Sequence, residues 1–288
     1  MQNIEIKKSS LHDFEKIYPL LQEFNSPFSK QDWSHLFTYC WDGAEKFCGF
    51  HLENQEGVVG FMGLIFSCRY KDNQTYKFCN ITSLIVKKEY RMFTPLFLKE
   101  VKKMNDIVLI ALNPIHKAYL LWTKIGFIPI EKQYTIIPTI NEKFYRKTRA
   151  NVRELPIDFD QLDVENKRII TDHKKYNCKC IMFGNNTDYC VLIYRITHQI
   201  HFAIPVKKIH ILYISDTALF NENIIDFLNA FGTRFGLLSA VYVDSRFLDR
   251  KHFLLSITKK FTFPKILCCN PFKDKIGVDI LYSEAILL

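Results

Sequence analysis

Apolar residues recur along this chain with two different spacings, which predict strands interleaved with helices. Residues 10–24 carry apolar side chains every three or four positions after Ser10, a pattern typical of an amphipathic helix. A second helix is predicted to begin near Ser29. Shorter apolar runs bounded by polar turns predict strands at 4–6, 47–52, 58–68 and 77–86.

The pattern after residue 86 changes to helices that alternate with single strands. We expect a helix over 94–104, a strand over 107–112, a helix over 114–125 and a strand from Phe127. An antiparallel meander followed by helix, strand, helix and strand predicts a mixed α/β sheet. One part of that sheet would be antiparallel, and a parallel crossover would begin near Val86.

The second half partly repeats this order. Residues 141–156 are basic and lack periodicity, so we expect a junction there and two domains, 1–145 and 146–288. Helices are then predicted at 159–173, 221–235 and 247–259, and strands at 178–183, 188–195, 209–214, 240–243, 266–269 and 278–288. The repetition is interpreted as an ancient duplication.

Composition is that of a globular protein. Of 288 residues, 48% are hydrophobic and 24% charged, which excludes a disordered chain. No apolar run reaches bilayer length and the first residues do not resemble a secretory signal, so a cytoplasmic location is expected. The nine cysteines lack the spacing of a zinc site. They are expected to be reduced and buried, and no metal is expected.

A formal net charge of +9 favours an anionic partner. A phosphate-rich small molecule and nucleic acid are both candidates. Nucleic acid is the less favoured of the two, since Lys and Arg are spread along the chain rather than gathered in one segment outside the junction.

Two segments carry the chemistry. The first, 84–96, is a predicted strand that leads directly into a helix, and backbone N–H groups at such a helix start bind phosphate. Thr94 is a suitable N-cap there and Pro95 fits the first helical position. The second, 113–127, is a strand end with an Asn, then a helix, then Gly126 and Phe127 opening a strand.

These two segments resemble the GNAT superfamily of acyl-CoA N-acyltransferases. Residues 90–96 occupy the place of the family's pyrophosphate loop. The family's later motif is matched by Asn113, Ala118, Trp122, Lys124, Gly126 and Phe127. Through element order the resemblance extends over residues 4–137, and it implies an α/β fold of two tandem GNAT-like domains, the second of them degenerate.

The resemblance implies an N-acyltransferase, most simply an N-acetyltransferase, with acetyl-CoA or another acyl-CoA as co-substrate and a small amine as acceptor. A backbone N–H within Leu84–Val86 would stabilise the oxyanion. The implied cofactor-binding residues are Leu84, Ile85, Val86, Arg91, Met92, Phe93, Thr94, Leu96, Asn113, Trp122 and Lys124. The resemblance identifies no general base, and the candidates are Glu23, Asp32, His35 and His116.

Departures from the family pattern leave an alternative open. Thr94 and Leu96 replace the loop glycines, and Pro95 has no N–H to offer phosphate. Trp122 stands where the family usually has a proton-donating Tyr, and helical spacing also suits it to a core position. The alternative is a catalytically inactive GNAT-like protein or interaction module.

The second half has no comparable motif. Acids at Asp216 and Glu222 lie where its phosphate loop would be, so it is not expected to bind CoA. It is expected to complete the acceptor cleft, to pack against the first half or to support a homodimer. Bacterial proteins of two-half design suggest an amino-sugar nucleotide as the acceptor.

Overall fold

The fold is given by a computed structural model that describes residues 3–24, 27–41, 43–71, 73–131, 133–139, 153–155, 162–184, 188–201, 204–236, 238–249, 255–261, 265–272 and 277–288. The chain divides into two compact units. The first contains Met1–Ile130 together with Pro264–Leu288, and the second contains Glu131–Phe263. Each unit is built around its own seven-stranded mixed sheet.

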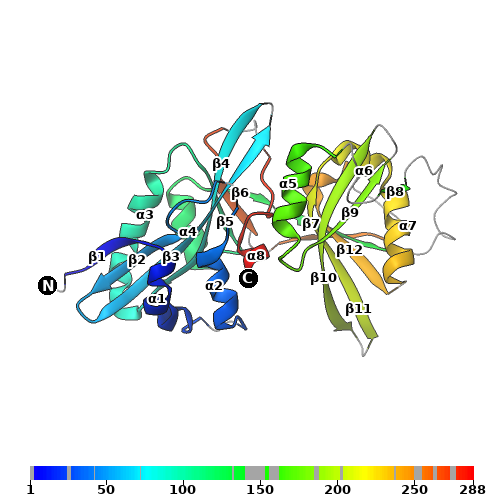
Figure 1. The fold of residues 1–288 in the computed structure, drawn as a ribbon. Coiled ribbons are helices and arrows are strands. Elements are labelled where there is room, and N and C mark those ends of the chain that lie inside the picture. The colour runs from blue at the N-terminus through cyan, green and yellow to red at the C-terminus, as the bar shows by residue number, and fades with distance from the viewer. Residues whose placement is uncertain are drawn as a thin grey trace. The chain divides into compact units, whose positions relative to one another are not determined.

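Up to β6 the first unit follows the predicted order of elements (Figure 1). Its elements are β1 (Glu5–Ser9), η1 (Leu11–Asp13), α1 (Phe14–Leu21), α2 (Lys30–Thr38), β2 (Gly49–Asn54), β3 (Gly57–Lys71), β4 (Gln74–Val86), η2 (Lys88–Phe93), α3 (Thr94–Lys102), β5 (Val108–Leu112), α4 (His116–Lys124), β6 (Ile128–Glu131), β14 (Ile266–Cys269) and α8 (Glu284–Leu287).

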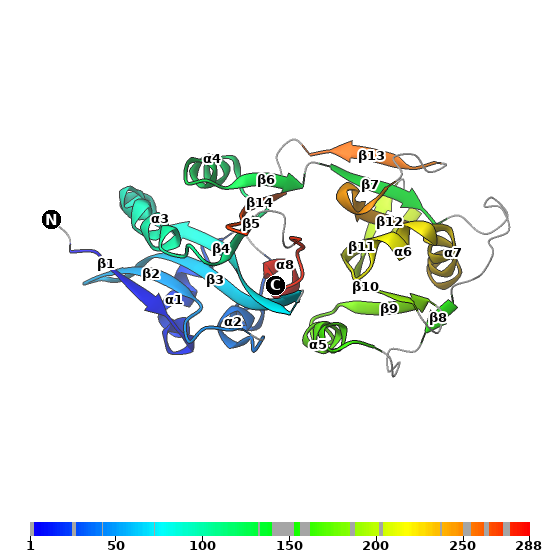
Figure 2. The ribbon, with the colours of Figure 1, turned by 90° about the horizontal axis from the view of Figure 1, so that it is seen from above.

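The sheet of the first unit has the strand order β1-β2-β3-β4-β5-β14-β6. Its described ladders are antiparallel except for that between β4 and β5, as the predicted crossover requires. Helices α1 and α2 cover one face and α3 and α4 the other (Figure 2). Phe97, Val101 and Trp122 from α3 and α4 are buried in one core cluster, because the apolar stripes of both helices face the sheet.

The second unit consists of β7 (Gln133–Pro138), β8 (Arg153–Leu155), α5 (Val164–His173), β9 (Lys179–Gly184), β10 (Tyr189–His201), β11 (Ile204–Ile214), α6 (Thr217–Glu222), α7 (Ile224–Phe235), β12 (Ser239–Asp244), η4 (Ser245–Phe247) and β13 (Ile257–Lys260). Its sheet order is β13-β7-β12-β11-β10-β9-β8, with β11 and β12 parallel. A meander followed by a parallel pair is therefore common to both units.

The two observed units differ from the predicted domains 1–145 and 146–288, because each unit includes a strand that the prediction gave to the other. Strand β14, from the end of the chain, lies between β5 and β6 in the first sheet. Strand β7, which the sequence assigned to the first domain, lies between β12 and β13 in the second. Local apolar patterns identify such strands but not their partners, so they gave the wrong sheet for both.

Two predicted elements are wrong. The helix expected over 247–259 is replaced, among its described residues, by η4 and by β13, an exposed edge strand that ends in two lysines and pairs with β7. The strand expected over 278–288 is a buried irregular segment that ends in α8. Most of the predicted junction at 141–156 lies outside the described residues.

Within the described part of the chain, no helix is both long and apolar enough to span a bilayer. The described His, Cys, Asp and Glu side chains do not form a group of three or more able to hold a metal ion.

Candidate functional site

In the first sheet, the parallel ladder between β4 and β5 ends partway along β4. They pair from Phe78 opposite Val108 to Ile81 opposite Ala111. Beyond Ile81, β4 runs on to Val86 and keeps its ladder only with β3 on its other side. Because β5 ends at Leu112, the arm of β4 from Thr82 to Val86 has no ladder on its β5 side among the described residues, and we call the opening beside this arm the V. Leu84, Ile85 and Val86, the predicted thioester-binding residues, lie on that arm.

A β-bulge marks the start of this arm of β4. Thr82 pairs with Gly63 and Ile85 with Phe61, so Ser83 and Leu84 together oppose the single residue Met62. Ser83 has φ +53°, a left-handed conformation that is strained for a residue other than glycine. Bulges leave an extra peptide group without a ladder partner, and strain of this kind gathers at functional sites.

The predicted phosphate-binding turn differs from a simple helix start. A 3-10 helix, η2, runs without interruption into α3, and Phe93 rather than Thr94 is the N-cap. The Thr94 N–H and its hydroxyl both donate to the carbonyl oxygen of Arg91, the hydroxyl at 2.8 Å. Bonds inside the 3-10 turn occupy donors that an isolated helix start would leave open. Thr94 is therefore not the expected cap.

Apolar side chains of this turn face inward. Phe93 and Leu96 pack against the core cluster of the first unit, whereas Met92 is 78% exposed. The cations of the turn are on the surface. Lys88 and Arg91 are exposed and Lys87 is half-buried, and among the described residues no carboxylate lies within ion-pair distance of the three.

The second motif begins at the end of β5. Asn113 is exposed with φ +40°, and its N–H donates to the carbonyl oxygen of Lys265 at 2.8 Å. Trp122 is 3% exposed and its ring lies 5.4 Å from that of Phe127, so it has a core position, and Lys124 is exposed at the end of α4. The structure thus favours packing, not cofactor contact, for Trp122.

A segment that the sequence analysis did not associate with the site lies beside β4. Residues 277–288 cover the face of the first sheet opposite α3 and α4, and Asp279 forms an ion pair with Arg69 of β3. The Arg69 guanidinium stacks 4.3 Å from the ring centroid of Tyr282. These contacts bring α8 against α2 and against β4 at the point where β4 leaves β5.

Asn80 connects the three elements at that point. It is 1% exposed, its side-chain amide donates to the carbonyl oxygen of Ile110 on β5 at 3.3 Å, and its Oδ1 accepts the backbone N–H of Glu284 at 3.0 Å. The Oε2 atom of Glu284 is buried without a hydrogen-bond partner among the described residues. A carboxyl group thus lies at the apex of the V.

The four bases considered from sequence do not converge there. Asp32 is the third residue of α2, and its carboxylate accepts hydrogen bonds from the hydroxyl and backbone N–H of the N-cap Ser29; these bonds lower its pKa. Glu23 and His116 are exposed, at the end of α1 and the start of α4. His35 is half-buried on α2, with Nδ1 3.3 Å from the carbonyl oxygen of Leu287 in α8.

A second polar cluster in this unit has the composition of a hydrolase triad but not its access. Ser9 Oγ lies 2.9 Å from His51 Nδ1, and His51 Nε2 lies 3.8 Å from a Glu53 carboxylate oxygen. Ser9 is 0% and His51 1% exposed. The cluster joins β1 to β2, which β3 separates from β4 in the sheet, and we assign it to the packing of β1 on β2.

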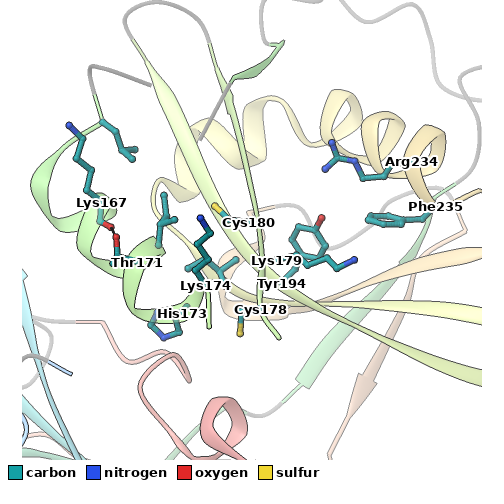
Figure 3. Close-up of a pocket in the computed structure, with 13 residues that line it drawn as sticks. Lys167, Thr171, His173, Lys174, Cys178, Lys179, Cys180, Tyr194, Arg234 and Phe235 are labelled. Atoms are coloured by element: carbon teal, nitrogen blue, oxygen red, sulfur yellow. Dashed lines mark hydrogen bonds between the residues drawn. The ribbon is translucent and has the colours of Figure 1, made fainter. Parts of the chain in front are cut away.

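The second unit contains a cleft of 1060 Å³ (Figure 3). Its apolar lining includes Ile193 and Tyr194 of β10 and Phe235 of α7. Its other described lining includes four cations and no acid, the cations being Lys167, Lys174, Lys179 and Arg234. This lining suits an anion with an apolar body. The sequence gave no signal for the cleft, because its residues come from α5, β9, β10 and α7.

Comparison with known proteins agrees on the fold. No family model and no curated protein sequence matches the chain. Among solved structures, a GCN5-related N-acetyltransferase from Anabaena variabilis matches with a TM-score of 0.58 and 11% identity over 95% of this chain and 74% of its own.

Two further structures match in the same way. A probable N-acyltransferase from Enterococcus faecalis matches with a TM-score of 0.58 and 12% identity over 92% of this chain and 72% of its own. A GCN5-related N-acetyltransferase from Kribbella flavida matches with a TM-score of 0.57 and 8% identity over 93% and 71%. The chain therefore has the GNAT-superfamily fold of the GCN5-related N-acetyltransferases.

Proposed function

We propose that this chain is an acyl-CoA-dependent N-acyltransferase whose reaction takes place at the V between β4 and β5. The observation that carries the proposal is the end of the β4–β5 ladder at Ile81 and Ala111, combined with the bulge at Ser83. A gap bounded by unpaired backbone groups can hold an extended amide-containing chain such as pantetheine by strand-like hydrogen bonds.

The bulge supplies the electrostatic element of the mechanism. A backbone N–H at Ser83 or Leu84, freed from the β3 ladder, can donate to the thioester carbonyl oxygen as negative charge develops on it. Removal of one such donor costs roughly 100- to 1000-fold in kcat in enzymes where it has been measured. Holding the amine and the thioester together supplies much of the remaining acceleration.

The phosphates of CoA would be held mainly by side chains. Lys87, Lys88 and Arg91 lie directly after β4, at the end of the V from which the nucleotide part of CoA would extend. Backbone donors contribute less than in a glycine-rich loop, since the Thr94 N–H is already bonded and Pro95 has none. We therefore expect affinity to depend on Arg91 and on ionic strength.

Acetyl-CoA is the proposed donor and a small-molecule amine the proposed acceptor. An amino-sugar nucleotide is the acceptor class we propose to examine first, because the net charge of +9 favours an anionic substrate. The occupied Thr94 N–H favours one competing function, an interaction module that no longer binds CoA.

Thermal unfolding with acetyl-CoA, CoA and ATP separates these functions. A ligand at about a hundred times its Kd stabilises the fold by roughly 2.7 kcal/mol. We expect acetyl-CoA and CoA to stabilise the first unit. Arg91→Gln should weaken acetyl-CoA binding several-fold without weakening that of S-acetylpantetheine, and Lys259→Gln on β13 is the matched control. Stabilisation by none of the thioesters would support the interaction module.

Transfer itself is measured as acceptor-dependent release of the CoA thiol with a panel of amines. Release that depends on an amino-sugar nucleotide would support the acceptor class. Release only with other amines would support the proposed acyltransferase activity and contradict the proposed acceptor class.

A further inference from the structure

Glu284 is a titratable group whose hydrogen bonds in the first unit leave one of its two carboxyl oxygens unsatisfied. It opens α8, and its Oε2 atom is buried without a hydrogen-bond partner among the described residues. Burial raises its pKa from 4.5 to about 8. Hydrogen bonds from its own backbone N–H and from the Asn80 side chain lower it by less. A buried polar atom without a partner is rare and requires an explanation.

The carboxyl group lies next to the reaction site. Glu284 is bonded through its backbone to Asn80, and Asn80 is bonded to β5 in the last stretch of β4–β5 pairing. Thr82 follows on the same face of β4, about 7 Å further along. The bulge at Ser83 comes next. The carboxyl group and the bulge are thus joined through consecutive residues of one strand, from Asn80 to Ser83.

Three described titratable groups on the neighbouring elements are already engaged. They are His35 on α2, whose ring faces the Leu287 carbonyl, Arg69 on β3, which pairs with Asp279, and Tyr282 beneath Arg69. None of these is a cause of the raised pKa of Glu284, which follows from burial. A neutral carboxyl group that ionises near the working pH of an enzyme has the property required of a general base.

We propose that Glu284 is the general base that deprotonates the acceptor amine, a role that rests on the proposed acyltransferase function. The Glu284 carboxylate takes one proton from the acceptor ammonium, and the freed nitrogen lone pair forms a bond to the thioester carbonyl carbon. The carbon–sulfur bond then breaks and CoA leaves as the thiolate with the electron pair. The second proton lost by nitrogen reaches the thiolate, and Glu284 returns its proton to water.

The test compares full-length wild type with Glu284→Gln, which keeps the shape of the side chain and removes its basicity. Glu56→Gln, in the exposed turn between β2 and β3, is the matched control. Acetyl-CoA binding by calorimetry and kcat/KM from pH 6 to 10 are measured for all three. We expect Glu284→Gln to bind acetyl-CoA as wild type does, and to lose roughly 100- to 10,000-fold in kcat/KM.

The pH profile provides a second measurement that needs no variant. The wild-type kcat/KM should rise to a plateau above an apparent pKa near 8, and this limb should stay in place for acceptors whose amines differ in pKa. A limb that moves with the amine, or a Glu284→Gln enzyme within threefold of wild type, would overturn the role of Glu284 and leave the acyltransferase standing. Wild type that binds no thioester would overturn both.

Discussion

The buried carboxyl group of Glu284 predicts an unusual dependence of stability on pH. Because the folded pKa is about 8 and the unfolded value 4.5, the folded state holds its proton where the unfolded state has lost it. Stability should therefore fall as pH rises from 4.5 to 8 and level off above. At about 1.4 kcal/mol per pKa unit, the full loss is at most about 5 kcal/mol, and roughly 3 kcal/mol at pH 7.

Glu284→Gln removes this penalty, since an amide does not ionise. The variant and wild type should have similar free energies of unfolding near pH 5, and the variant should be the more stable by several kcal/mol at pH 8.5. The assay is urea unfolding at pH 5, 7 and 8.5, followed by tryptophan fluorescence. All three tryptophans, Trp33, Trp41 and Trp122, are buried in the first unit, so the signal reports the unit that contains Glu284.

A difference between variant and wild type that stays constant from pH 5 to 8.5 would refute this reasoning, because it would mean that Glu284 does not titrate in that range in the folded state. Glu56→Gln should follow wild type at each pH, since that side chain is exposed.

Three other perturbations examine the parts of the first unit that hold the site. Asp279→Ala leaves the Arg69 guanidinium without its ion-pair partner and should lower the free energy of unfolding, measured by urea and tryptophan fluorescence, by about 3 kcal/mol; an unchanged free energy of unfolding would contradict it. Ser83→Val should destabilise by roughly 1–3 kcal/mol because of the positive φ, whereas Ser83→Gly should stay within about 1 kcal/mol of wild type in the same assay; equal effects would argue against the bulge. A fragment of residues 1–145 lacks β14 and the segment that covers β5, so it should show no cooperative unfolding by calorimetry, and a sharp transition would show that 264–288 is dispensable.

Local patterns in the sequence predicted most of the elements of the first unit. Helices over 94–104 and 114–125 and a strand over 107–112 agree with α3, α4 and β5 to within a few residues. These elements have strong apolar periodicity and short connections, so their own residues determine them. The mixed sheet and its parallel crossover follow from the order of the elements.

The parts that could not be predicted depend on distant partners. The strand 266–269 was predicted, but its place between β5 and β6 depends on pairing across more than a hundred residues. The bulge has no local signal, because its positive φ falls on Ser83 rather than on a glycine. Glu284 meets Asn80 across 204 positions, and only the fold reveals that its carboxyl group is buried.

The same carboxyl group bears on the choice between an enzyme and an inactive relative of the fold. The closed 3-10 turn at Thr94 weakens one element of the site, the backbone cradle for phosphate, and taken alone it favours an inactive protein. Glu284, in contrast, favours an active enzyme. Glutamine would fit the position without the ionisation penalty, and stability alone therefore disfavours the acid. An ionisable residue that lowers stability at neutral pH, placed at the end of the β4–β5 ladder, is what the proposed role in proton transfer requires. The polar chemistry of the site is concentrated at the apex of the V rather than at its phosphate end, and activity with a phosphate-free thioester is the result that would separate the two ends.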